Sequence, residues 1–413
     1  MTSRTSDLPV LIMADFKDEP LSCQKHLFGI ESDMHYLNNA AYGPMLSSSK
    51  ESGIEMLNLL SNPQQITSGL HFDRPAELRS QIAQLINCSD KDCIAIIPAQ
   101  SYGMAVVSNN LHRLPGIEMK RDIVILEDEF PNDTYALQRT AEILGLAIRA
   151  VPCPEELNTV ADCWNERVLA CITAETALLV VPQVHWVKGV LLDIDAFAVK
   201  CRSVGALCVV DGTQSVGVVP FDIERTRPDA LIACAYKWLM GPYSIGFAYF
   251  GSFFDDGVPV EETWMNRVDS DHLAGIMTLK DHYRPRAQRY NMGEMSQFLN
   301  VAIWSAGLRQ LLEWKPARVA AYISELTVEP LHRLSMLGCL TIPPTQRAAH
   351  IIALHLPACA NTQRLLEVLE RRRVKVSLRG VIIRVAVNIF NDTADLAALV
   401  DAVQEVVSEG RNL

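Results

Sequence analysis

The chain has 413 residues, of which 49% are hydrophobic and 21% are charged, and its formal net charge is −11. This length exceeds what one hydrophobic core normally serves, so two folded units are expected. The excess of acidic residues argues against nucleic acid or an anionic membrane as a partner, and no apolar run approaches the ~20 residues of a membrane-spanning helix.

Two features indicate the cellular compartment. The run LPVLIM at residues 8–13 is too short for a secretion signal and lacks a basic leader. The 11 cysteines form no C-x-x-C pair, which is typical of free thiols in a reducing environment rather than of a disulfide framework or a zinc site. We therefore expect a cytoplasmic protein without a structural metal ion.

Short apolar runs with the length and β-branched composition of buried strands recur in the first two thirds of the chain. They cover residues 93–97, 122–126, 147–151, 177–181, 206–210, 230–234 and 246–250. Most are separated by stretches with helical spacing, for instance Leu78, Ile82, Leu85 and Ile86. This alternation predicts an α/β domain around a mostly parallel seven-stranded sheet, which binds ligands beyond the carboxyl ends of its strands.

After residue 270 the pattern changes to long helical segments, at 296–313 and 317–336. Two strand candidates, HIIALHL (350–356) and VIIRVAV (381–387), then bracket a helix near 361–371, and a last helix covers 393–408. These elements predict a smaller C-terminal α+β domain. We divide the chain into an N-terminal segment that joins the small domain (1–60), a large domain (61–270) and the small domain (271–413).

Two polar residues follow neighbouring strands of the expected sheet. Asp211 comes directly after the strand at 206–210, and Lys237 follows the next strand, 26 positions later. Because the carboxyl ends of parallel strands meet at one edge of a sheet, these side chains should lie close together. They could form an ion pair, or they could both bind one cofactor.

Pyridoxal phosphate requires both residue types. A lysine forms a Schiff base with the cofactor and must be able to lose its charge, while an acid pairs with the pyridine nitrogen. The phosphate needs an anion pocket, which the start of a helix provides. Gln100 and Ser101 lie where an expected strand turns into a helix; a serine there is more often only an N-cap, but this one falls in the first turn of the same sheet.

Four segments in this order carry a resemblance to a known family: YLNNAAYGPM (36–45), the phosphate turn, the aspartate-to-lysine element, and IRVAVNIFNDTADLAALVDAV (383–403). Together they resemble the aminotransferase class V branch of the fold-type I pyridoxal-phosphate enzymes, which includes cysteine desulfurases, kynureninases and isopenicillin N epimerase-like proteins. The resemblance implies the fold of a fold-type I PLP-dependent transferase, pyridoxal 5'-phosphate as the cofactor and a small amino acid as the substrate.

The resemblance also implies roles for individual residues. Lys237 matches the Schiff-base lysine, Asp211 the partner of the pyridinium nitrogen, and Gln214 a hydrogen-bond donor to the ring oxygen. Gln100 and Ser101 match the phosphate turn. In the last segment, Arg384 matches the arginine that grips the substrate carboxylate, with a buried ion pair as the structural alternative.

Several positions depart from the desulfurase pattern. Phe130 and Tyr236 both stand where desulfurases have histidine: a phenyl ring can stack on the cofactor but cannot transfer protons, whereas the phenol could reach the phosphate. Cys234 replaces a serine that contacts the phosphate. Trp186 replaces an asparagine that bonds the ring oxygen, so it is expected to pack or stack, and the adjacent His185 either faces the substrate or has a structural role.

The reaction depends on which bond at the α-carbon breaks. Cys339 and Cys359 are the candidates for a desulfurase thiolate, but neither has a basic neighbour in the sequence. Phe130 and Tyr236 are similar to the kynureninase arrangement. We expect an amino acid to react through an external aldimine by transamination or epimerisation, with Lys237 as the general base; a C–S or C–C lyase and a non-catalytic scaffold are the alternatives.

The resemblance further implies a homodimer, since fold-type I active sites are usually completed by a second subunit. The segment RYNMGEMSQF (289–298) matches the region where relatives reach the partner's phosphate. Glu294 occupies a place where threonine is common, and an acid there would repel the phosphate.

Overall fold

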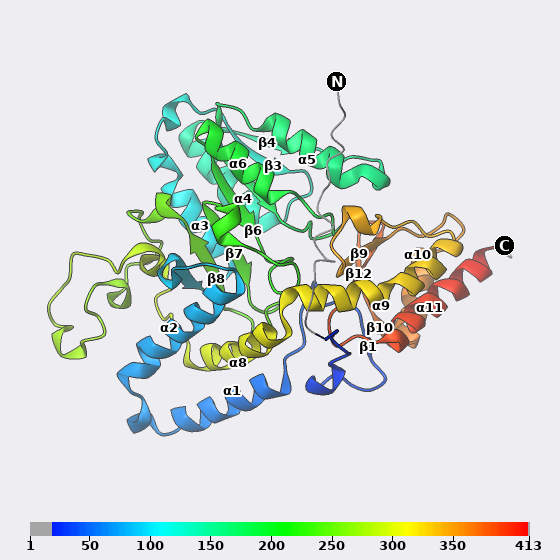
Figure 1. Cartoon of the computed structure of the whole chain (residues 1–413), viewed down its shortest axis with the longest axis horizontal. Helices are drawn as coiled ribbons and strands as arrows, with labels where there is room; N and C mark the ends of the chain where they lie inside the picture. Colours follow the sequence, from blue (N-terminus) through cyan, green and yellow to red (C-terminus); the bar gives the residue numbers. More distant parts are fainter. Residues whose placement is uncertain (1–18, 412–413) are drawn as a thin grey trace.

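The computed structural model describes residues 19–411, and its largest sheet has seven strands (Figure 1). In spatial order they are β2 (Ile94–Ile97), β8 (Gly246–Phe250), β7 (Ala230–Cys234), β6 (Leu207–Asp211), β5 (Thr176–Pro182), β3 (Asp122–Leu126) and β4 (Ala147–Val151). The sequence analysis placed each of these strands within one residue at either end. The run at residues 8–13 lies outside the described residues.

The strand directions confirm a mostly parallel sheet. The neighbours from β7 to β4 all pair in parallel, and β8 alone runs antiparallel to both β7 and β2. Asp211, the last residue of β6, pairs with Pro182 of β5 and with Ile232 of β7. The chain therefore reaches Lys237 soon after β7 ends, at the same edge of the sheet.

Helices cover both faces of this sheet, which explains why its strands are continuous apolar runs. Along β3, Val124 packs into one hydrophobic core and the flanking Ile123 and Ile125 pack into the other. The first core includes residues of α5 (Val160–Cys171) and α6 (Ile194–Val204). The second includes residues of α3 (Gln100–Asn110) and α4 (Pro131–Leu144).

Three further helices pack together beside the sheet. In Figure 1, α1 (Ser47–Leu60) and α2 (Ser68–Leu85) lie along α8 (Phe298–Trp314), and the contacts between them agree. The four apolar residues that indicated a helix at 78–86 are all buried in the first core. Within residues 19–411, no helix combines the length and apolar character needed to cross a bilayer.

The C-terminal part of the chain forms a second, smaller sheet. Its order is β11 (Ser377–Arg379), β12 (Ile382–Ala386) and β9 (Ile351–Leu354), all antiparallel. The helices of this part are α9 (Pro316–Met336), α10 (Thr362–Arg371) and α11 (Thr393–Arg411), while α7 (Ile223–Thr226) is a single turn before β7. The sequence analysis predicted β9 and β12 but missed β11. The domain boundaries at residues 60 and 270 remain predictions.

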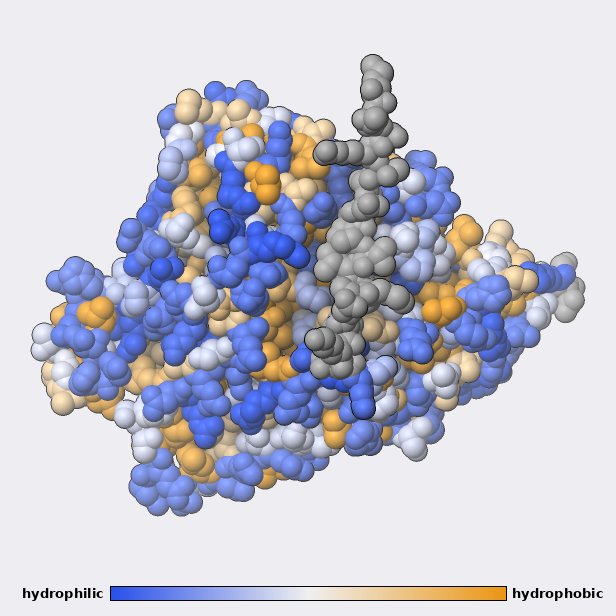
Figure 2. Space-filling view, in the orientation of Figure 1, coloured by the Kyte–Doolittle hydropathy of each residue, from blue (hydrophilic) through white to orange (hydrophobic). Residues whose placement is uncertain are grey.

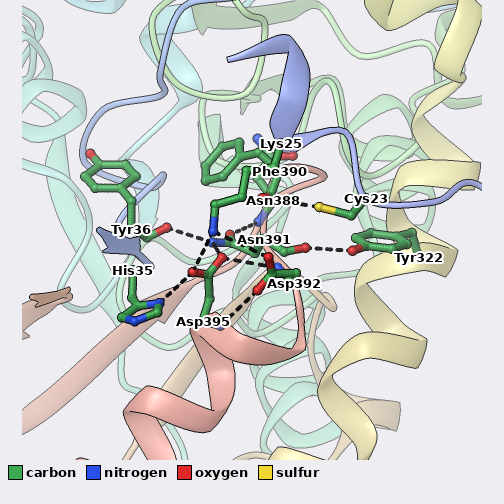
Figure 3. Close-up of polar contacts among 10 residues, drawn as sticks. All are labelled: Cys23, Lys25, His35, Tyr36, Tyr322, Asn388, Phe390, Asn391, Asp392 and Asp395. Carbon is green, nitrogen blue, oxygen red and sulfur yellow. Dashed lines mark hydrogen bonds and ion pairs between the residues drawn. The ribbon is translucent and has the colours of Figure 1, made fainter. Parts of the chain in front are cut away.

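The N-terminal segment is attached to this C-terminal part. The two-residue strand β1 (His35–Tyr36) pairs in parallel with β10 (Val374–Lys375). A polar network anchors it further (Figure 3): the buried Asp395 carboxylate, at the start of α11, accepts hydrogen bonds from Lys25 Nζ at 3.1 Å and Asn391 Nδ2 at 3.0 Å and lies 2.8 Å from His35 Nδ1. One carboxylate thus ties two N-terminal side chains to the C-terminal helix.

We expect Asp395→Ala to lower the free energy of unfolding by about 2–3 kcal/mol, because it leaves several buried donors without their charged acceptor. Urea denaturation followed by circular dichroism measures this. Asp401→Ala on the same helix is the control, since that side chain is 49% exposed and, within residues 19–411, forms an ion pair with Arg333 alone; it should cost under about 1 kcal/mol. Equal costs for the two variants would contradict the anchoring role of Asp395.

Candidate active site

A cleft opens at the carboxyl ends of the parallel strands. Among the residues expected to form the site, those that line it are Gln100, Phe130, Trp186, Asp211, Gln214, Tyr236 and Lys237. The structure does not bring Ser101, His185 or Arg384 into the lining.

The turn that carries Lys237 is held by the N-terminal segment. The N–H of Gly43 donates to Tyr236 O at 2.8 Å, and Asn39 Nδ2 donates to Lys237 O at 3.1 Å. A side chain at position 43 would place its Cβ 2.2 Å from the Lys237 carbonyl oxygen, so only glycine fits this approach. The segment YLNNAAYGPM is therefore part of the site, although none of its side chains lines the cleft.

Lys237 is only 7% exposed, and its Nζ lies 5.6 Å from the ring centroids of both Phe130 and Tyr236. Within residues 19–411, no carboxylate is close enough to form an ion pair with it, so the simple Asp211–Lys237 ion pair is not present. Burial lowers the pKa of Lys237, and the nearby positive charge of Arg384 lowers it further, against the opposing effects of Cys234 and Asp211. The environment therefore favours a neutral amine, as imine formation requires.

The Asp211 carboxylate is oriented by the turn that follows it. Its Oδ1 accepts a hydrogen bond from the N–H of Thr213 at 2.8 Å. Two further acids, Glu129 and Asp133, lie behind it. Burial raises the pKa of Glu129 to about 8, and burial together with repulsion from Asp211 raises the pKa of Asp133 well above its usual value. Asp211 is thus backed by carboxyl groups that favour the neutral form.

The sequence analysis missed Glu129 and Asp133. Asp133 lies in the first turn of α4, where an acid is common because it interacts well with the helix dipole, so its type and position gave no separate signal. The Gln100 side chain contacts one of these acids: its Nε2 donates a hydrogen bond to Asp133 Oδ1. The Gln100 side chain therefore joins the acids near Asp211.

The start of α3 retains the geometry of an anion site. The helix begins at Gln100, so the N–H groups of Gln100 and Ser101 have no carbonyl partner within the helix. Pro98 and Ala99, just before it, line the cleft. Ser101 is exposed and lies outside the lining.

Gln214 keeps little hydrogen-bonding capacity for a ligand. Its Nε2 donates to Ala40 O at 3.1 Å, and its Oε1 accepts from Trp238 Nε1 at 2.8 Å. Because an amide nitrogen carries two hydrogens, one remains for a group in the cleft.

Arg384, on β12 of the second sheet, lies outside the cleft lining and contacts the backbone of Trp186, which belongs to the lining. It is 1% exposed; its Nη1 donates to Trp186 O at 2.8 Å, while Nε and Nη2 are buried without a partner. Burial lowers the pKa of Arg384 to about 10. In residues 19–411 no carboxylate pairs with it, so the buried ion pair considered above is absent.

His185 is fully buried next to Trp164, with ring centroids 5.2 Å apart. Its Nδ1 accepts hydrogen bonds from the N–H groups of Val187 at 3.3 Å and Lys188 at 3.2 Å. Burial lowers the pKa of His185 to about 3, so the ring is neutral at physiological pH. This geometry agrees with the structural alternative for His185.

The two candidate thiols lie outside the cleft lining. Cys339 is buried, and burial raises its pKa to about 11, which disfavours the thiolate. Cys359 is exposed and also lies outside it. Glu294 is exposed and contributes nothing to the cleft of this chain.

Comparison with known proteins identifies the family. The aminotransferase class V family model matches residues 67–383. The chain belongs to this family. An uncharacterised aminotransferase of Bacillus subtilis (strain 168), YcbU, is 23% identical to this chain, and the match covers 79% of this chain and 82% of the relative. The kynureninase of Pseudomonas fluorescens is 28% identical, and that match covers 45% of this chain and 43% of the kynureninase.

The solved structures agree with this family at the level of the fold. The apo structure of a cysteine desulfurase from Thermococcus onnurineus NA1 matches with a TM-score of 0.80 over 95% of this chain and all of that chain, at 18% identity. The class V family and the fold-type I architecture predicted from the sequence are therefore confirmed. The protein is a pyridoxal-phosphate-dependent enzyme of the transferase-like group, within which lyases and isomerases also occur.

Proposed function

We propose that the protein uses pyridoxal phosphate bound to Lys237 to transform a small amino acid by α-proton transfer, in a transamination or an epimerisation. One observation carries the proposal: the Lys237 amine, without a carboxylate partner among residues 19–411, and the Asp211 carboxylate line the same cleft. A lysine that only served stability would be expected to pair with a carboxylate or to reach water.

The residues of the cleft fit the cofactor. When bound, pyridoxal phosphate supplies an electron sink for the substrate's α-carbon. Lys237 Nζ would hold the aldehyde, and Asp211, oriented by the Thr213 N–H, would keep a proton on the ring nitrogen. Phe130 lines the same cleft and would be available to pack on the ring, and the backbone N–H groups at the start of α3 would suit the phosphate.

The substrate is positioned by Arg384. Its Nε and Nη2 atoms have no hydrogen-bond partner, and together they can donate two parallel hydrogen bonds to one carboxylate. The aromatic rings of Phe130 and Trp186, with centroids 5.4 Å apart, form an apolar wall of the cleft that would limit access of water to a bound substrate. The Lys237 amine would be the base that takes the α-proton, and its lowered pKa favours the neutral form that can accept a proton.

A carbon–carbon lyase is the second candidate. A kynureninase is among the relatives, and the presence of Phe130 and Tyr236 in place of two histidines favours carbon–carbon cleavage. A desulfurase is less well supported, because neither Cys339 nor Cys359 lines the cleft. A scaffold without chemistry would not need the unpaired Lys237 and Arg384, since buried unpaired charges cost stability.

We also propose that the protein acts as a cytoplasmic homodimer. Family members are commonly dimeric, and apolar side chains are exposed near the cleft, including Tyr42 at 47% and Tyr243 at 59%. The segment at residues 262–284 projects from the body of the molecule (Figure 1), and its Met277 and Leu279 are 91% and 93% exposed. Figure 2 shows apolar residues scattered among polar ones on this projection. Such a segment suits a subunit interface.

A spectral titration tests the proposed function. Holoenzyme is titrated with a panel of L- and D-amino acids, and the products are identified. We expect amino acids to change the cofactor absorbance, with a keto acid or an inverted stereocentre as the product. Release of alanine with a second fragment would support a lyase instead, and no response to any amino acid would contradict the proposed function.

A further inference from the structure

Two arginines of the second sheet share one face. In the β11–β12 pair, Ser377 lies opposite Arg384, and Arg379 lies opposite Ile382. Paired residues point to the same side of a sheet, as do residues two apart in a strand. Arg379 and Arg384 therefore project from the same face, on which Ile382 packs against Val187 and Trp186.

Both guanidinium groups reach the wall of the cleft at Trp186. Arg384 Nη1 donates to the Trp186 carbonyl oxygen, and the Arg379 Cζ lies 6.0 Å from the centroid of the Trp186 ring. The positive charge of Arg379 lowers the pKa of both Arg384 and Lys237, which indicates that the three cations are close to one another.

Arg379 has no anionic partner in the part of the chain that the structure describes. Its only side-chain hydrogen bond there runs from Nη1 to Leu378 O at 2.9 Å. Asp128, whose carbonyl oxygen accepts from Trp186 Nε1, pairs its carboxylate with Lys188 at 3.8 Å instead.

The charges around the cleft do not balance. Asp211 is the only acid among its lining residues, and the cofactor's ring nitrogen uses that charge. Burial favours the neutral form of Lys237, and one substrate carboxylate would satisfy Arg384. Arg379 is left as a half-buried cation beside Trp186, which is favourable if a second anionic group enters with the substrate.

We propose that the substrate is an amino acid whose side chain carries a second carboxylate, bound by Arg379 while Arg384 binds the α-carboxylate. This inference rests on the proposed function and narrows its substrate class to acidic amino acids. The phosphate of the cofactor is the other anion that Arg379 could hold, and the experiment separates the two.

The test compares acidic amino acids with their neutral amides of equal size. Holoenzyme is titrated with L-glutamate against L-glutamine and with L-aspartate against L-asparagine, using the cofactor absorbance as the readout. Glutarate and butyrate carry no amino group, so calorimetry with these two ligands measures the preference for a second carboxylate without any reaction at the cofactor. The variants are Arg379→Gln, Arg379→Lys as the conservative change, and Arg139→Gln as the control, since Arg139 is exposed on α4 and makes no ion pair within residues 19–411.

We expect at least one acidic amino acid to bind at least ~10-fold more tightly than its amide, and glutarate more tightly than butyrate. Arg379→Gln should weaken binding of the acidic amino acid by ~10–100-fold, with little change for the amide. Arg379→Lys should retain part of the preference, and Arg139→Gln all of it.

Equal affinity for the acids and their amides would overturn the inference. So would an Arg379→Gln variant that loses affinity for pyridoxal phosphate but not the preference among substrates, because Arg379 would then hold the phosphate. If no amino acid changes the absorbance, the proposed function fails, whereas the calorimetric comparison still decides whether Arg379 selects a second carboxylate.

Discussion

Lys237→Ala should lower turnover by at least about 10³-fold and should leave the protein without the yellow colour of a bound cofactor. The variant loses both the covalent bond to the cofactor and the base that moves the α-proton, and proton transfer alone contributes ~10²–10⁴-fold. Replacement of Lys237 should not unfold the protein, because its amine forms no ion pair among residues 19–411. Absorbance spectra and single-turnover rates measure the effect.

The matched control for this variant is Lys91→Ala, an exposed lysine in the short turn before β2. It should keep both the colour and the rate. If Lys237→Ala turned over substrate at the rate of the native chain, the amine would have no part in the chemistry.

Asp211→Asn should have the second-largest effect, a fall in turnover of about 10²–10³-fold, as expected when one preorganised charge is removed from a site. The substitution keeps the size of the side chain and an oxygen that can accept from Thr213 N–H, so the turn after β6 should persist. What it removes is the negative charge that keeps the ring nitrogen protonated and the cofactor an effective electron sink.

Cofactor affinity and the rate of α-hydrogen exchange should be measured for this variant together. The control is Asp256→Asn, because the native Asp256 side chain is 92% exposed and lies 4.0 Å from Arg289, which makes a long and weak ion pair. An Asp211→Asn variant that exchanges the α-hydrogen as fast as the control would show that the acid does not support the chemistry. Asp211→Glu should recover less than full activity, because the longer side chain moves the carboxylate away from the position fixed by Thr213.

The parts of the fold that were predicted correctly depend on local pattern. Five strands of the large sheet, β2, β3, β5, β6 and β7, are buried at every residue, so each reads as a continuous apolar run with clear ends. The edge strand β4 is mostly exposed, and its sequence was recognised by its length and apolar composition. By contrast, β11 is only three residues long and contains an arginine, so it forms no apolar run that would predict a strand. Asp211 and Lys237 could be placed together because adjacent parallel strands end at one edge of a sheet.

The parts of the site that were missed depend on tertiary packing. The contact of the Gln100 side chain with Asp133 could not be foreseen, because it depends on the α3 and α4 helices packing against each other on one face of the sheet, while the phosphate role of the turn at Gln100 stays a prediction. Arg379 had no sequence signal, since a single arginine near a strand end is usually solvated. Its register opposite Ile382, on the face that bears Arg384, places it beside Trp186.

The central claim is that Lys237 bonds covalently to pyridoxal phosphate, and the most direct test is to reduce the holoenzyme with borohydride, digest it and locate the added mass. We predict that the phosphopyridoxyl group lies on the peptide containing Lys237, with the yellow colour bleached in proportion. Modification of a different lysine, or no modification of a chain that had bound the cofactor, would contradict the account.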